Sequence, residues 1–167
     1  ASATVAIDAA PFRGVLPLPL SALRSASPVL RNPLNWGRTK SLTAAQFRRS
    51  FANMLDESEA AEIYERGPVP GPGRPLFQAA TANINPRTAA RVDSRNPKRG
   101  PMLIIASDRD QVVPPAISKA SFKLQSRNES PTRYHEFHGK GHSLVLDHGW
   151  RDVAEVSVDF IAQHLPA

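Results

Sequence analysis

Apolar positions along the chain fall into clear periodic segments only in its second part. Residues 102–106 are continuously apolar, which is typical of a strand buried on both faces of a parallel sheet. Residues 132–137 alternate in polarity and predict a second strand. Residues 115–126 and 150–164 carry apolar side chains at helical spacing. The order strand, helix, strand, helix with short connections predicts a right-handed parallel β-α-β-α unit.

The first hundred residues contain shorter segments separated by prolines. Residues 3–7 are apolar and predict the end of a buried strand. Five prolines in residues 11–42 predict an irregular segment with helical turns only at 21–25. Helices are predicted at 43–55, where Thr43 and Gln46 fit a capping box, at 57–66 behind Asp56, and at 76–82. Seven Gly or Pro in residues 67–75 argue against a helix or central strand there, and 84–100 reads as a basic loop.

Composition fits one globular domain and excludes several kinds of site. The 167 residues contain no cysteine, which rules out disulfides, Cys-ligated zinc, iron–sulfur clusters and a thiol nucleophile within them. No apolar run approaches the ~20 residues that span a bilayer. Because no signal peptide is visible, we expect a cytoplasmic protein.

The net charge of +6 is unevenly distributed. Residues 1–100 carry 14 Lys or Arg and 7 Asp or Glu, whereas residues 101–167 carry 7 and 8. The basic residues of the first part are scattered and are not interleaved with aromatic residues, so we do not expect nucleic-acid binding. Attraction of an anionic or amphiphilic ligand fits this distribution better.

Two loops that follow the predicted strands carry residues with catalytic chemistry. Asp110 lies after the strand at 102–106, and His142 lies after the strand at 132–137. Ligands bind to open α/β sheets at the carboxyl ends of the strands, so we expect both side chains at one edge. A carboxylate beside an imidazole fixes its tautomer and stabilises its protonated form. The two residues would form the acid and base half of a catalytic triad.

Other interpretations of these loops stay open. Asp108 is nearer the strand end and competes with Asp110 for the role of acid. Asp110 can also serve only as a turn residue, and His142 only as a surface residue. Ser107 and Ser143 adjoin the two motifs, but neither lies in a strand–turn–helix elbow with flanking glycines. We therefore do not expect either serine to be the nucleophile.

The sequence predicts no cofactor and no metal site. The glycines between His138 and His142 favour a loop over a metal-binding helix face. Three residues of the helix at 43–55, Phe47, Phe51 and Met54, are predicted to bind substrate. A stripe of this kind is also typical of a helix that packs into a core.

The loop motifs D-R-D-Q-V-V-P and, about thirty residues later, G-K-G-H-S resemble the C-terminal part of an α/β-hydrolase. In that fold the triad runs in the order nucleophile, acid, histidine. The resemblance implies that Asp110, in a D-x-x-V-P turn, is the acid and that His142, in a G-x-G-H loop, is the histidine. It also implies an α/β fold class, with parallel strands six to eight, their helices, and a mainly helical cap.

The remaining segments extend this resemblance to most of the chain. The stretches F-R-G-V-L-P-L-P-L-S-A-L-R-S-A, G-R-T-K-S-L-T-A-A-Q-F-R and G-R-P-L-F-Q-A-A-T-A-N are similar to caps of actinobacterial α/β-hydrolases of unassigned substrate. Residues 1–10 then correspond to the end of a core strand, 11–100 to a Pro-rich helical cap, and 101–167 to the C-terminal part of the core.

One element of the family pattern is missing from the sequence. The nucleophile elbow G-x-S-x-G should precede the cap, and it does not occur in these 167 residues. We therefore expect the C-terminal portion of an esterase- or lipase-like serine hydrolase, with its nucleophile in a missing N-terminal half. Such a protein would act on a small acyl or ester substrate, and the chain alone would be inactive.

The alternative is a non-catalytic basic module that binds a ligand or a partner. In either case, sheet edges and apolar faces left without neighbours should make the isolated chain marginally stable, oligomeric or aggregation-prone.

Overall fold

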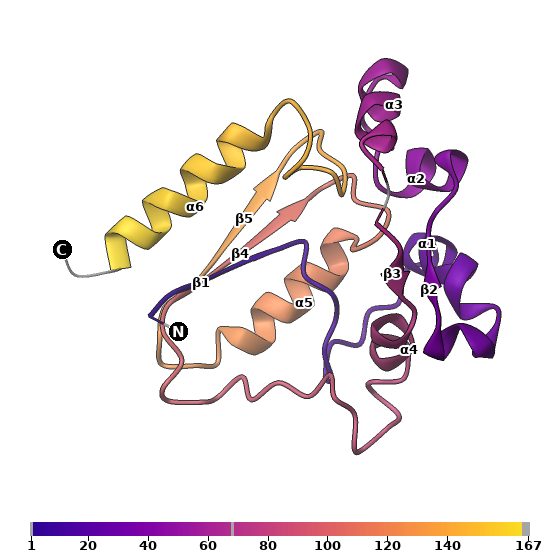
Figure 1. The fold of residues 1–167 in the computed structure, drawn as a ribbon. Helices are drawn as coiled ribbons and strands as arrows, with labels where there is room; N and C mark the ends of the chain where they lie inside the picture. Colours follow the sequence, from indigo (N-terminus) through magenta and orange to yellow (C-terminus); the bar gives the residue numbers. More distant parts are fainter. Residues whose placement is uncertain (1, 68, 165–167) are drawn as a thin grey trace.

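Three parallel strands form the centre of the structure, a computed structural model that describes residues 2–67 and 69–164 (Figure 1). The sheet has the order β1–β4–β5, with strands β1 (Thr4–Ile7), β4 (Met102–Ser107) and β5 (Thr132–Phe137). β4 lies between the other two and pairs with both in parallel. The predicted boundaries at residues 1 and 167, and residue 68 in the Gly- and Pro-rich run, lie outside the described residues.

Two helices cover opposite faces of this sheet, α5 (Pro115–Gln125) and α6 (Trp150–His164) (Figure 1). The α6 side forms a core of Leu103, Ile105, Leu144, Val153 and Phe160. On the α5 side, the ring of Phe122 packs against Tyr134 of β5, with 5.5 Å between ring centroids. Successive side chains of a strand point to opposite faces of the sheet, so a continuous apolar run makes both faces apolar. The predicted parallel β-α-β-α unit is therefore confirmed.

The other helices lie to one side of α5 and of the sheet, with α2 and α3 nearest the carboxyl ends of the strands (Figure 1). They are α1 (Leu20–Leu30), the 3₁₀ helix η1 (Pro33–Gly37), α2 (Ala44–Ser50), α3 (Glu57–Glu65) and α4 (Arg74–Ala80). Two short antiparallel strands, β2 (Thr39–Lys40) and β3 (Gly71–Pro72), join this group. The predicted capping box of Thr43 and Gln46 is present at α2, and Asp56 caps α3.

The prediction that residues 11–42 form no more than short helical turns was wrong, because α1 runs for 11 residues with Pro28 inside it. Proline has no N–H, so the carbonyl of Arg24 loses its usual helical donor. The hydroxyl of Ser27 donates to that carbonyl instead, at 2.8 Å. A neighbouring side chain thus replaces the hydrogen bond that the proline removes.

Two other helix boundaries also differ from those predicted. The helix expected at 43–55 ends at Ser50, and the chain continues in turns that bury Ala52 and Leu55 in a small core. The helix expected at 76–82 begins at Arg74 with a proline in its first turn, a position that proline favours. The run at 67–75 also contains β3, because a two-residue edge strand tolerates Gly and Pro. No helix in the described part of the chain has the length and apolar character needed to cross a bilayer.

Candidate active site

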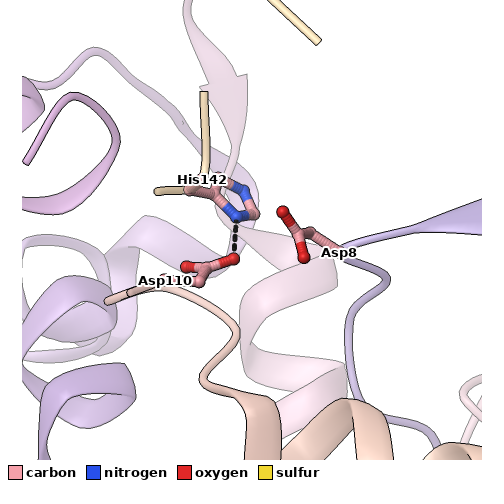
Figure 2. Close-up of side chains that lie close together, drawn as sticks. All are labelled: Asp8, Asp110 and His142. Carbon is pink, nitrogen blue, oxygen red and sulfur yellow. Dashed lines mark hydrogen bonds and ion pairs between the residues drawn. The ribbon is translucent and has the colours of Figure 1, made fainter. Parts of the chain in front are cut away.

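Asp110 and His142 meet at the carboxyl ends of β4 and β5 (Figure 2). Oδ2 of Asp110 lies 2.7 Å from Nδ1 of His142. The other carboxylate oxygen of Asp110 accepts the backbone N–H groups of Val112, at 2.6 Å, and Val113, at 2.9 Å. The Asp110 side chain is fully buried, whereas the imidazole keeps 17% of its surface exposed. The acid is thus held rigidly, and pairing through Nδ1 leaves Nε2 of the imidazole free to accept a proton.

Backbone hydrogen bonds hold the two loops against each other. The N–H of Asp108 donates to the carbonyl of Phe137 at 3.0 Å, and the N–H of Arg109 donates to the carbonyl of Lys140 at 3.0 Å. These bonds join the two loops just beyond the last residue pair of β4 and β5. The relative position of the acid and the imidazole is therefore set by the backbone as well as by their own contact.

The competing residues in these loops have other partners. Asp108 lies 3.4 Å from Nδ1 of His138 and accepts the N–H of Gly139 at 2.8 Å. The hydroxyl of Ser107 is buried and donates to Asp8 at 3.0 Å. Ser143 is also buried, and its hydroxyl has no partner among the described residues. Asp110, and not Asp108, is thus the carboxylate brought to His142.

Sequence reasoning missed Asp8, which directly follows β1 at the same edge of the sheet (Figure 2). An oxygen of Asp8, an oxygen of Asp110 and a ring nitrogen of His142 all lie within 4.8 Å of one another. The backbone N–H of Ser107, at 3.2 Å, and its hydroxyl donate to the Asp8 carboxylate. The available signal was a charged residue directly after an apolar strand that was expected to belong to this sheet.

The environment of Asp8 favours its protonated form. Burial and the negative charge of Asp110 raise the pKa of Asp8 to about 7, against the opposing effects of His142 and the Ser107 hydroxyl. Two carboxylates this close cannot both ionise without a cost in free energy. Asp8 therefore exchanges its proton near neutral pH, whereas an ordinary aspartate is ionised there.

Two carboxylates and an imidazole are also donors that a divalent metal ion accepts. Metal binding at all three residues would require Asp8 to be ionised and the imidazole to offer a free nitrogen to the ion. The short contact between Asp110 and His142, and the raised pKa of Asp8, fit an acid–base arrangement better than a metal centre.

Of the three residues predicted to bind substrate, Phe51 contacts His142, Phe47 lies behind Phe51, and Met54 is exposed. The ring of Phe51 packs edge-on against the imidazole, with 4.6 Å between centroids. Phe47 stacks on Phe51 at 5.8 Å and packs against the small core around Ala52. Met54 is 42% exposed. Their role as substrate-binding residues stays a prediction.

Asn53 connects the helical region to both loops of the site. Its amide Nδ2 donates to the carbonyl of Arg109 at 2.9 Å. Its Oδ1 faces Gly141, where an added Cβ atom would lie 2.6 Å away. The loop that carries His142 therefore needs a glycine at this position for the close approach of Asn53.

Gly141→Ala is expected to lower the free energy of unfolding by about 1 kcal/mol, because Asn53 must rotate away and lose its hydrogen bond to Arg109. Urea unfolding measures this change. In an Asn53→Ala background the same substitution should cost much less, since the clash is gone. Equal costs in the two backgrounds would contradict the contact.

No family model matches the sequence, and no curated protein matches it. Solved structures do match the fold. A monoacylglycerol lipase from Paleococcus ferrophilus has a TM-score of 0.59 and 18% identity, over 98% of this chain and 60% of that one. An esterase from a Rhodococcus species has a TM-score of 0.54 and 15% identity, over 95% and 55%. A meta-cleavage product hydrolase from Pseudomonas fluorescens has a TM-score of 0.58 and 18% identity, over 95% and 55%.

The matched part of these structures and the strand order β1–β4–β5 decide the fold class. The chain has the fold of the C-terminal part of an α/β-hydrolase. It spans between 55% and 60% of the length of the three structures. At identities below 20%, the likeness establishes the fold and leaves the activity to be argued from the site.

Proposed function

We propose that this chain supplies the acid and the base of a serine-hydrolase site that acts on a small ester or related acyl substrate. Asp110 is the acid, His142 is the base, and the nucleophile comes from a polypeptide segment outside these 167 residues. The observation that carries the proposal is the 2.7 Å contact between a fully buried carboxylate and a partly exposed imidazole at the carboxyl ends of two parallel strands.

The geometry supports general base catalysis by His142. Asp110 holds the proton on Nδ1, so Nε2 can take the proton of an attacking hydroxyl group. The buried negative charge of Asp110 then stabilises the imidazolium, and Nε2 returns the proton to the leaving group. The two N–H groups that bind the second oxygen of Asp110 hold the carboxylate in the orientation that this task requires.

Two observations favour a nucleophile from another segment. Ser107 and Ser143 are both buried, and neither hydroxyl hydrogen-bonds to His142 among the described residues. Within those residues β1 also pairs only with β4, which leaves its other edge open to a further strand. Next to this edge is a mostly apolar hollow of about 160 Å³, lined by Ile7, Val145, Trp150, Val153, Ala154 and Ser157.

The helical region fits the role of a cap over this site. Residues 11–100 include α1 to α4, of which α2 and α3 lie beyond the carboxyl ends of the strands (Figure 1). Phe51 reaches the imidazole from this region and gives the site an apolar wall. We therefore assign Phe47, Phe51 and Met54 to the part of the substrate pocket that binds the acyl group. Residues 11–100 would correspond to the cap of an actinobacterial α/β-hydrolase.

Hydrolysis of p-nitrophenyl acetate tests the proposal in two forms of the protein. The 167-residue chain is expected to show no hydrolysis that depends on His142. A longer form that extends upstream of Ala1 and contains a serine elbow is expected to hydrolyse the ester and to react with a fluorophosphonate probe.

A rate that His142→Ala removes from the 167-residue chain would place the nucleophile within it and overturn that part of the proposal. A longer form with a serine elbow but no activity on short acyl esters would overturn the hydrolase assignment and favour a binding module.

A further inference from the structure

A second carboxyl group faces the imidazole of His142, in addition to its partner Asp110. Asp8 is only 7% exposed, and one of its oxygens lies within 4.8 Å of a ring nitrogen of His142 and of an Asp110 oxygen. Asp8 follows β1, so the segments after all three strands of the sheet each contribute one residue to this cluster (Figure 2). The proposed acid–base mechanism uses Asp110 and His142 and leaves Asp8 without a function.

The local backbone is built to hold Asp8 in this place. Asp8 has a φ of 38°, in the left-handed region, and it is the only described residue other than glycine with a positive φ. Aspartate and asparagine enter this region more readily than most other residues. The N–H of Asp8 still bonds to the carbonyl of Ile105 at 3.0 Å, so the chain turns only after the last ladder bond.

Ser107 fixes the carboxyl group itself. Its backbone N–H donates to Oδ1 of Asp8 at 3.2 Å, and its hydroxyl donates to Oδ2 at 3.0 Å. Ser107 is fully buried at the end of β4. The carboxyl group of Asp8 is therefore oriented from β4 toward the loops that carry Asp110 and His142.

We propose that Asp8 is a positioning residue of this site, whose gain or loss of a proton changes the charge that His142 faces. With Asp8 protonated, the imidazole faces one negative charge, that of Asp110. With Asp8 ionised, its proton having passed to solvent, the imidazole faces two, which favours the imidazolium form. The site would then hold a stronger base on the alkaline side of this change.

The groups around Asp8 support a change near neutral pH. It faces Ser107 at the end of β4, Asp110 in the loop after β4, and His142 in the loop after β5. From β5 the phenol of Tyr134 is influenced by Asp8, by Glu136 and above all by burial, all of which raise the pKa of the phenol. The hydroxyl of Tyr134 donates a hydrogen bond to Glu136. The raised pKa keeps this phenol neutral, so the charge of the cluster is set by Asp8, Asp110 and His142.

NMR of the 167-residue chain tests this inference without substrate, so it stands apart from the hydrolase proposal. The side-chain carboxyl ¹³C signal of Asp8 should titrate near pH 7. In Asp8→Asn, the ring nitrogen signals of His142 should report less of the imidazolium form than in the unaltered chain at the same pH above 7, because one negative charge near the imidazole is gone. Asparagine keeps the left-handed backbone, so this variant removes the charge and preserves the fold.

Two further variants make the experiment decisive. Asp108→Asn is the matched control, because Asp108 contacts His138 and not His142; it should leave the His142 titration unchanged. Ser107→Ala keeps the carboxyl group but removes a hydroxyl donor, so Asp8 should lose its proton at higher pH. The inference is overturned if Asp8 titrates near pH 4, or if Asp8→Asn changes His142 no more than Asp108→Asn does.

Discussion

Replacing His142 by alanine is expected to lower kcat for a short ester by at least ~10³-fold in the form of the protein that contains the nucleophile. The substitution removes the group that takes the proton from the attacking hydroxyl. KM should change little, because the imidazole contributes to the transition state more than to ground-state binding. Steady-state kinetics with p-nitrophenyl acetate measures both constants.

The same two loops provide a matched control. His138 and Asp108 form a second imidazole–carboxylate contact, at 3.4 Å, but the His138 side chain is 81% exposed. His138→Ala should therefore leave kcat within about twofold, as expected for a surface residue outside the chemistry. Asp110→Asn should lower kcat by up to ~10⁴-fold, because an amide at this position favours the wrong tautomer of His142. Similar losses for His138→Ala and His142→Ala would refute the assignment of the base.

The core of the fold was predictable because local and long-range signals agree there. The apolar run at 102–106 and the alternation at 132–137 correspond to β4 and β5, and the helical spacing at 150–164 corresponds to α6. A strand order for this unit follows from right-handed crossovers, so Asp110 and His142 could be expected at one edge.

Two of the missed features, Asn53 and Asp8, depend on tertiary contacts, whereas helix α1 is supported by a local contact. Pro28 argues against a helix by itself, and only the neighbouring Ser27 hydroxyl compensates for its missing N–H. Asn53 carries no motif, yet it bridges the helical region and the loop of Arg109. Asp8 directly follows the apolar run at 3–7, but its closeness to His142 depends on the pairing of β1 with β4 across nearly a hundred residues. Such contacts have no local signature in one sequence.

Asp8 should also give the chain an unusual dependence of stability on pH. Burial and Asp110 raise its pKa to about 7 in the folded state, whereas the unfolded chain has the ordinary value of 3.8. Between these values the folded state keeps a proton that the unfolded state has released. The free energy of unfolding contributed by this group is therefore fully present below pH 4 and is lost as the pH rises to about 7.

Asp8→Asn is expected to remove this dependence and to stabilise the chain by a few kcal/mol at pH 8, since each unit of pKa shift corresponds to about 1.4 kcal/mol. At pH 4 both proteins carry a neutral, hydrogen-bonded side chain at this position and should unfold at similar urea concentrations. Glu59, whose pKa is held low by His148 against the effect of burial, is present in both proteins and cancels in the comparison. Urea unfolding from pH 4 to pH 8 gives the two curves. Parallel curves would contradict the prediction, because Asp8 would then be ionised throughout this range. If the advantage of Asp8→Asn grows with pH, the ionised carboxyl group beside His142 lowers the stability of the chain.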